Sequence, residues 1–314
     1  MSACLLCGSE HTSFLFRQTD RLYRTTPKEF DVVRCRQCGL ARLDPQPPPE
    51  ELRRYYPDAY WFAPDGSLAG RLEEAYRKAV LHGHVRFVER ALRNTSARGP
   101  LLDVGCGGGL FLGMMRRRGF RVIGLDFSSR AAAVASRHHQ VPAVAGDLEH
   151  APLRPATFAA ITMSHVLEHL PDPRVYLAAA HRLLAPDGRL VVHVPNAASW
   201  QFRLLGRRWN GVDVPRHLFD YRDEDMERLL QACGFEVLRR SYFSLRDNPA
   251  GLATSLAPGL DPMARRVRQV REGAALRLAK DLAHLALAAA ALPVTLAEAA
   301  FRAGSTVMME ARRR

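Results

Sequence analysis

A glycine-rich loop constrains the fold of this chain more than any other feature. The loop reads Asp103-Val-Gly-Cys-Gly-Gly-Gly109, follows the apolar stretch 101–104 and precedes a helical pattern over 110–118. Glycines at a strand-to-helix turn let the backbone bend tightly and approach a ligand, as in nucleotide and cofactor sites. A pyrophosphate loop needs Gly-x-Gly-x-x-Gly, and Leu110 stands where its third glycine would be. The loop therefore predicts a cofactor other than a dinucleotide.

Short apolar runs alternate with helical patterns after residue 101, which predicts βαβ units on a parallel sheet. Strands are expected at 101–104, 121–125, 143–145, 159–163, 190–194, 235–243 and 306–311. Helices are expected at 68–93, 110–118, 128–139 with Ser128 as N-cap, 174–184 and 223–233. The chain is thus expected to be an α/β protein.

Acids stand where such a sheet would present them to a cofactor. Asp126 ends the second strand, and Asp147 follows the third in Gly146-Asp-Leu148. With the glycine loop and Ser164-His-Val-Leu-Glu-His-Leu-Pro-Asp-Pro173, these motifs closely resemble class I S-adenosylmethionine-dependent methyltransferases over roughly residues 70–243 and the final strand. The resemblance implies a Rossmann-like seven-stranded sheet in the order 3-2-1-4-5-7-6.

The same resemblance implies roles for individual residues. Asp103 would hold the methionine amino group beside Gly105 and Gly107, Asp126 the ribose hydroxyls, and Asp147 the adenine amino group; a turn cap is the alternative role for Asp147. The remaining residues expected in the cofactor site are Cys106, Gly109, Phe127, Leu148 and Ser164.

Three histidines are candidates for the base that takes a proton from an acceptor hydroxyl. His165 follows strand four, His169 lies one turn later, and His217 stands in Pro215-Arg-His-Leu218, a segment similar to one that lines the active-site mouth of bacterial surface-glycan and natural-product methyltransferases. The alternative is that any of these imidazoles is a structural residue with satisfied hydrogen bonds.

Two Cys-x-x-Cys-Gly units occupy the first 45 residues: Cys4 and Cys7, then Cys35 and Cys38. Four thiolates in two tight turns predict a structural zinc ribbon built from two β-hairpins, with a strand over 30–35 leading into the second unit. A redox pair is the alternative.

The expected domains are the ribbon (1–45), an extended Pro-rich linker (46–67), the methyltransferase domain (68–243 plus 305–314) and a mostly helical insertion (244–304). Within the insertion, 265–280 is basic and 282–297 almost wholly apolar, yet too short to span a bilayer. Two hypotheses follow: a cap whose apolar face covers a substrate pocket, or a segment that docks on a membrane surface.

The formal charge of +13 is carried almost wholly by arginine, which indicates coding bias more than a polyanion partner. We expect S-adenosylmethionine and zinc as cofactors and a small-molecule, glycan or lipid-linked acceptor. The alternatives are an RNA methyltransferase that grips nucleic acid through the ribbon and arginines, and a non-catalytic interaction protein. The first residues lack the basic and apolar segments of a signal peptide, so a cytoplasmic location is expected, with peripheral contact at the inner face of the membrane if the insertion docks there.

Overall fold

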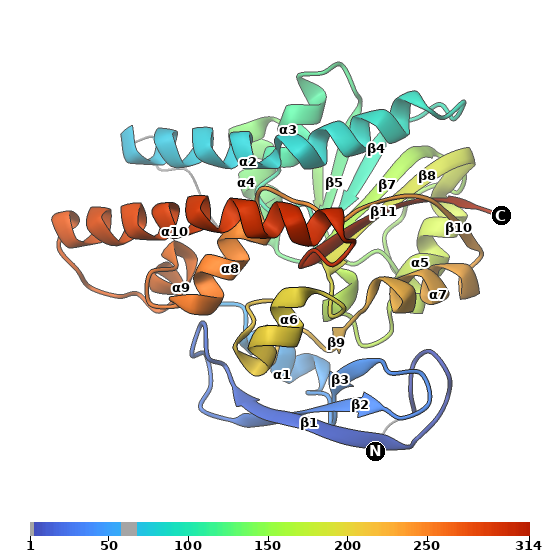
Figure 1. Cartoon of the computed structure of the whole chain (residues 1–314). Helices are drawn as coiled ribbons and strands as arrows, with labels where there is room; N and C mark the ends of the chain where they lie inside the picture. The colour runs from blue at the N-terminus through green and yellow to red at the C-terminus, as the bar shows by residue number, and fades with distance from the viewer. Residues whose placement is uncertain (1–2, 58–67) are drawn as a thin grey trace.

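One mixed seven-stranded sheet forms the centre of the computed structural model, which describes residues 3–57 and 68–314 (Figure 1). Its strands are β4 (Leu101–Val104), β5 (Val122–Asp126), β6 (Ala143–Ala145), β7 (Phe158–Ser164), β8 (Leu184–Pro195), β10 (Phe235–Ser241) and β11 (Thr306–Arg313). They lie in the order β10-β11-β8-β7-β4-β5-β6, with β4 to β8 parallel and β11 antiparallel to both its neighbours. Counted from β4, this is the predicted order 3-2-1-4-5-7-6.

Alternation along the central strands divides the core into two layers. Leu101 and Ala160 pack on one face beneath α2 (Leu68–Arg93) and α3 (Leu110–Arg116). Leu102 and Ile161, the next residues along, pack on the other face against α5 (Pro173–Leu183) and α7 (Asp223–Ala232). Side chains of consecutive strand residues point to opposite faces, so a sheet covered on both faces needs continuous apolar strands.

The helix α4 (Ser129–His139) follows β5 and begins as predicted. The Ser128 side chain accepts a hydrogen bond from the Ala131 backbone N–H, as an N-cap does. A capped start immediately after β5 fixes where the Asp126 carboxylate sits relative to the glycine loop.

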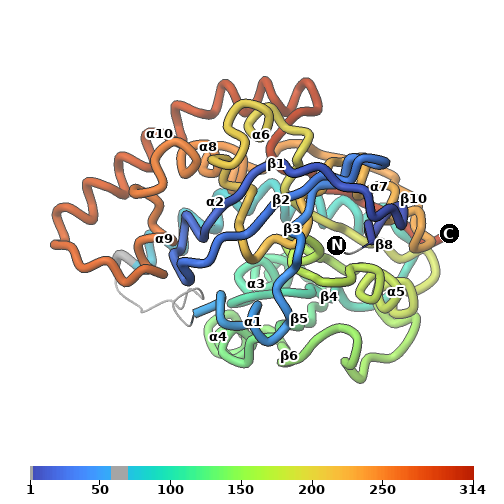
Figure 2. The backbone as a smooth tube through the Cα atoms, turned by 90° about the horizontal axis from the view of Figure 1, so that it is seen from below, coloured from blue at the N-terminus to red at the C-terminus, as the bar shows by residue number. Residues whose placement is uncertain are grey.

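The N-terminal cysteine module forms a second, antiparallel sheet. Its strands are β1 (Thr12–Thr19), β2 (Glu29–Cys35) and β3 (Ala41–Leu43), and a fourth strand, β9 (Phe219–Asp220), comes from the domain of the seven-stranded sheet and pairs with β3. Seen from below, β1 to β3 run across the near side of the molecule (Figure 2). The module is thus the two predicted β-hairpins, which share β2 as one meander, and β9 is added to it as a fourth strand that was not predicted.

The Pro-rich linker is not extended throughout. Residues Pro49–Arg54 form a short helix, α1, whose first position is proline, a residue that the first turn of a helix tolerates. Burial of Leu52 and, directly after the helix, Tyr55 stabilises this turn, so the extended-linker prediction is wrong over 49–54. Residues 58–67 of the expected linker lie outside the described residues.

The insertion before β11 is helical, as predicted, and consists of α8 (Asn248–Leu256), α9 (Pro262–Val267) and α10 (Ala274–Ala300). The polypeptide enters it from β10 and returns from α10 directly into the sheet through β11 (Figure 1). A further helix, α6 (Trp200–Leu205), follows β8.

Candidate active site

The glycine loop and the second acid meet at the carboxyl ends of β4 and β5. The Asp126 carboxylate accepts hydrogen bonds from the backbone N–H of Gly107 at 2.8 Å and of Ser128 at 2.9 Å. Gly105 has a φ of +73°, and a Cβ there would lie 2.7 Å from the Val166 side chain. The loop therefore requires glycine at this position for both its conformation and the space.

Asp103 is buried at the end of β4, and its Oδ1 accepts a hydrogen bond from the Thr162 hydroxyl at 2.6 Å. Burial raises the pKa of Asp103 to about 7, since a charged carboxylate is costly away from water. Burial likewise raises the pKa of the neighbouring Cys106 thiol, which is therefore protonated and unsuited to act as a nucleophile.

The remaining predicted cofactor residues surround this edge to different degrees. Phe127 is more than half exposed, while Leu148 is fully buried. Asp147 lies on the surface, and its Oδ1 accepts hydrogen bonds from the His150 backbone N–H at 3.0 Å and contacts the His150 ring at 2.8 Å. In this structure Asp147 caps its own turn, and its contact with adenine stays a prediction.

His165 follows β7 and lies between two carboxylates. Its Nδ1 is 3.2 Å from Glu168 Oε1, and its Nε2 is 3.4 Å from Asp247 Oδ1. Burial alone lowers the pKa of this imidazole, but the charges of Asp247 and Glu168 outweigh it and raise the pKa to about 9. His165 also has a φ of +54°, a conformation that non-glycine residues adopt at a cost and that is common at functional sites.

A second imidazole, His193 on β8, lies beside the first, with ring centroids 4.7 Å apart. Its Nδ1 is 3.2 Å from the Ser164 hydroxyl, and burial and the His165 charge lower its pKa well below the usual range. Within residues 3–57 and 68–314, the Nε2 atoms of both rings are buried and make no hydrogen bond. The neutral imidazole of His193 and the cationic imidazole of His165 thus both place Nε2 near Asp247, at 3.7 Å and 3.4 Å from its carboxylate oxygens.

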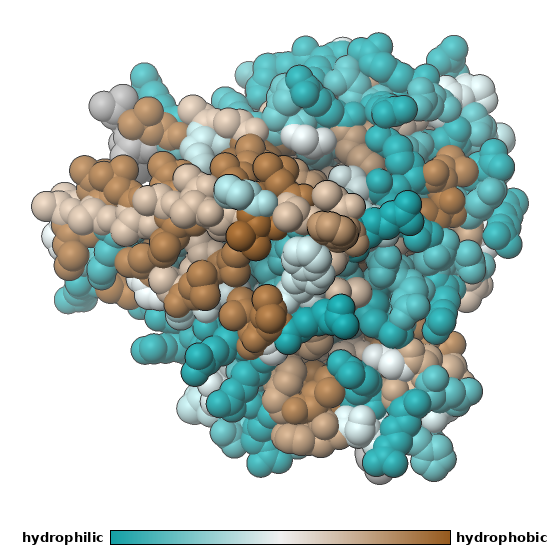
Figure 3. Space-filling view, in the orientation of Figure 1, coloured by the Kyte–Doolittle hydropathy of each residue, from teal (hydrophilic) through white to brown (hydrophobic). Residues whose placement is uncertain are grey.

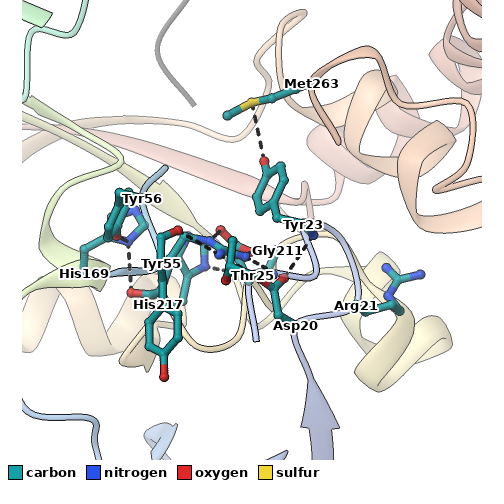
Figure 4. A network of polar contacts seen from close by, with 12 residues as sticks. Asp20, Arg21, Tyr23, Thr25, Tyr55, Tyr56, His169, Gly211, His217 and Met263 are labelled. Carbon is teal, nitrogen blue, oxygen red and sulfur yellow. Dashed lines mark hydrogen bonds and ion pairs between the residues drawn. The ribbon is translucent and has the colours of Figure 1, made fainter. Parts of the chain in front are cut away.

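The other two predicted histidines have structural partners. His169 Nδ1 lies 3.0 Å from the Arg216 carbonyl and 2.9 Å from the Tyr56 hydroxyl, while His217 Nδ1 lies 2.7 Å from the Gly211 carbonyl. Figure 4 shows Tyr56 beside His169, with His217 next to them. These contacts fit the structural alternative for both rings, and their catalytic roles stay predictions.

A buried arginine ties the ribbon to this site. Arg216 is fully buried and makes ion pairs with Asp213 at 2.6 Å and with Asp20 of the ribbon at 2.9 Å. Its guanidinium also stacks on Tyr23, 4.4 Å from the ring centroid, and Asp20 in turn accepts hydrogen bonds from Tyr23 and Thr25 (Figure 4). The segment that carries His217 is thus held by the ribbon.

The four predicted metal ligands gather at one point. Sγ of Cys4 lies 3.5 Å from Sγ of Cys38, Cys7 is equally close to Cys35, and all four sulfur atoms lie within 4.8 Å of one another. Four sulfurs at ~2.3 Å from a tetrahedral zinc would stand about 3.8 Å apart, so the cluster fits a zinc ribbon.

Four residues of the site were not predicted: Tyr56, Thr162, His193 and Asp247. Thr162 and His193 lie on strands that are otherwise apolar, and the strand pattern does not indicate a function for them. Their polarity in a buried strand is unusual, and it is the one signal that could have identified them. Asp247 stands just before Asn248-Pro249, a helix start, but the sequence does not indicate that this start faces His165.

Comparisons with known proteins agree with this geometry. A family model described as a methyltransferase domain matches residues 72–240. The chain is 33% identical over 173 residues to the ubiquinone biosynthesis O-methyltransferase of Pseudomonas aeruginosa (strain UCBPP-PA14), covering 51% of this chain and 74% of that one. It is 30% identical over 171 residues to the enzyme of the same name from Klebsiella pneumoniae (strain 342), covering 51% and 71%.

Among solved structures, geranyl diphosphate C-methyltransferase from Streptomyces coelicolor A3(2) matches with a TM-score of 0.54 at 14% identity, covering 84% of this chain and 98% of that one. At this identity the match shows a shared fold.

Proposed function

Because this chain belongs to the class I S-adenosylmethionine-dependent methyltransferases, we propose that it methylates a hydroxyl of a small-molecule acceptor, with His165 as the base. The observation that carries the proposal is the His165 imidazole, buried at the end of β7 between the carboxylates of Glu168 and Asp247. The two relatives named above are O-methyltransferases, which supports oxygen as the atom that receives the methyl group.

The residues at the ends of β4 to β6 fit the cofactor. When bound, S-adenosylmethionine supplies an activated methyl group on a sulfonium. Asp103 is buried, and burial raises the pKa of its carboxyl group. The positively charged amino group of the methionine part would pair with this carboxylate and stabilise it. Asp126 would accept hydrogen bonds from the ribose hydroxyls and Asp147 from the adenine amino group.

The acceptor would lie between the cofactor loop and His165. Methyl transfer would release the hydroxyl proton, and His165 Nε2, which makes no other hydrogen bond in the described structure, would accept it in the fraction of molecules whose imidazole is neutral. With a pKa of about 9 that fraction is small near neutral pH and grows as the pH rises, so activity should increase toward pH 9. A phenol-type hydroxyl, whose pKa is about 10, is acidic enough to give its proton to the neutral form of a base whose pKa is about 9. Asp247 stabilises the imidazolium that results, so it is a positioning residue.

We also propose that the four-cysteine cluster holds a structural zinc ion. Four protein ligands fill a tetrahedral site and leave no position for water, so the metal would stabilise the ribbon and take no part in methyl transfer. Through β9 and Arg216, the ribbon in turn holds one wall of the acceptor site.

The test is transfer of labelled methyl from S-adenosylmethionine to fractionated cell extract. We expect label in a small-molecule fraction with the wild type, its loss with Asp126→Ala, and a decrease of ~10²-fold or more with His165→Gln. His138→Gln, which changes an exposed histidine on α4, is the matched control and should retain full activity.

Two outcomes would overturn the proposal. Label found in RNA would assign a nucleic-acid substrate. Binding of S-adenosylmethionine by calorimetry without transfer in any fraction would indicate a non-catalytic protein.

A further inference from the structure

The helix α10 turns its small and polar side toward the protein and its apolar side outward. Its buried residues follow one stripe at helical spacing: His284, Ala288, Ala291, Thr295 and Glu298. Larger apolar side chains face away from the body, including Leu278 at 60% exposure and Leu285 at 47%. A helix on a water-soluble surface normally shows the reverse pattern.

The polar stripe is matched by the rest of the protein, so the orientation of α10 is specified. Glu298 accepts a hydrogen bond from Gln201 of α6 at 2.8 Å, and His284 Nε2 lies 3.1 Å from the Thr254 hydroxyl of α8. Rotating the helix to bury its leucines would leave these polar groups without their partners, which is unfavourable for groups that are buried. These polar contacts therefore fix the orientation of α10 with its apolar face outward.

The apolar surface is large and continuous with its neighbours. In Figure 3 hydrophobic side chains gather along α10 and on the elements below it on the same side of the molecule. The members with at least half of their surface exposed are Leu276, Leu278, Leu282, Val294, Leu296 and Phe301 on and after α10, Leu256 on α8 and Leu204 on α6. Contiguous apolar patches of this kind mark sites of interaction. The apolar face of α10 points outward, so this face does not support the cap hypothesis, which stays a prediction.

By length and composition α10 could cross a membrane, but the fold places both of its ends in one body. Before it, α9 packs against the ribbon residues Leu22 and Tyr23. After it, β11 is an inner strand of the main sheet. A helix anchored at both ends to the same domain can lie in the interface plane of a bilayer but cannot span it without unfolding the domain.

Basic residues at both ends of the apolar stretch favour a negatively charged partner. Arg271 and Arg277 precede it and Arg302 follows it; all three are exposed. The stretch 282–297 itself contains no Asp, Glu, Lys or Arg. One residue of the predicted basic cluster is not available to a partner, because Arg265 is buried and makes ion pairs with Glu272 and Asp281.

We propose that the α8–α10 face docks on an anionic lipid bilayer, with α10 lying in the headgroup region and the arginines on the headgroups. Asp247, beside His165, directly precedes α8, so docking would bring the acceptor side of the site to the membrane. The acceptor would then be an amphiphile that partitions into the bilayer; this extension rests on the proposed methyl transfer, whereas docking itself does not.

The test is co-sedimentation of the full chain with vesicles of phosphatidylcholine alone or mixed with phosphatidylglycerol. We expect binding to the mixed vesicles and a loss of about tenfold or more with Leu278→Glu/Leu285→Glu. The matched control, Phe14→Glu/Leu238→Glu, changes two exposed apolar residues on β1 and β10 and should bind as the wild type does.

Charge is tested separately with Arg271→Gln/Arg277→Gln, which should weaken binding to the mixed vesicles by roughly 10- to 30-fold. Circular dichroism and light scattering without lipid accompany each variant. The proposal is overturned if the wild type does not bind mixed vesicles, if the control double variant loses as much binding, or if the wild type is a dimer that the leucine variants dissociate. The last result would assign the face to a second copy of the chain.

Discussion

Replacing Asp247 by Asn should lower the pKa of His165 from about 9 by about 1 to 3 pH units. The Asp247 oxygen lies 3.4 Å from His165 Nε2. At that separation, opposite charges attract by about 5 kcal/mol at an effective dielectric constant near 20, and about 1.4 kcal/mol corresponds to one pH unit. The attraction of about 5 kcal/mol sets an upper limit on the shift, because water screens the Asp247 carboxylate, which is 17% exposed. Glu168, 3.2 Å from the ring, remains in the variant and still favours the charged imidazole.

The measurement is an NMR titration of the histidine ring protons between pH 5 and 10, which needs no acceptor. The His165 signal is assigned by its absence in His165→Gln. Asp31→Asn, which removes an acid from β2 in the ribbon, is the control and should leave the titration unchanged. The reasoning is refuted if His165 titrates near its ordinary ~6.5 in the wild type, or if Asp247→Asn leaves its pKa unchanged.

The same pair links pH to stability. Because the pKa of His165 is raised on folding, its contribution is fully present below pH ~6.5 and is lost as the pH rises through about 9. Urea unfolding should therefore show a smaller difference in stability between pH 6 and pH 10 for Asp247→Asn than for the wild type.

Three further predictions concern the ribbon and the glycine loop. Elemental analysis should find one zinc per chain, and Cys35→Ser should lower both the zinc content and the melting temperature; a full-length chain without metal but with unchanged melting would contradict the zinc proposal. Arg216→Met should destabilise the fold by about 3–5 kcal/mol in urea unfolding, because it leaves the buried carboxylate of Asp20 without its partner; a change below about 1 kcal/mol would show that the pair contributes little. Gly105→Ala should weaken binding of S-adenosylmethionine in calorimetry by at least about tenfold, since a Cβ would meet Val166 at 2.7 Å and the φ of +73° disfavours alanine; unchanged affinity would count against the loop as the binding site.

Local signals explain how much of the fold followed from the sequence. The strands β4 and β6 and the helix α2 begin and end where their apolar patterns predict, and Ser128 caps α4 as expected. Each of these features depends on residues close together in the chain. The sheet order came from a resemblance carried by motifs at strand ends, and the structure confirms it.

Features that depend on contacts between distant segments were not predictable. The two-residue strand β9 is too short to show a period, yet it completes the ribbon sheet. The helix α1 lies in a segment whose prolines suggested extension, and tertiary burial of Leu52 outweighs that preference. The partners of His165, Asp247 just before α8 and His193 on β8, are brought together by how the insertion returns to the sheet, which periodicity does not encode.

The pairing of β3 with β9 has a consequence for protein engineering. Suppose that the ribbon is exchanged between relatives by cutting after residue 57. The ribbon would then lose its fourth strand, β9, and Asp20 would be separated from Arg216. The edge of β3 and the buried Arg216 would both lose the partners that cover them. The transplantable unit is therefore discontinuous: the first 57 residues together with the segment 206–222. Chimeras that move both pieces should keep β3 paired with β9 and Arg216 paired with Asp20, and they would exchange the loop that carries His217 along with the metal module.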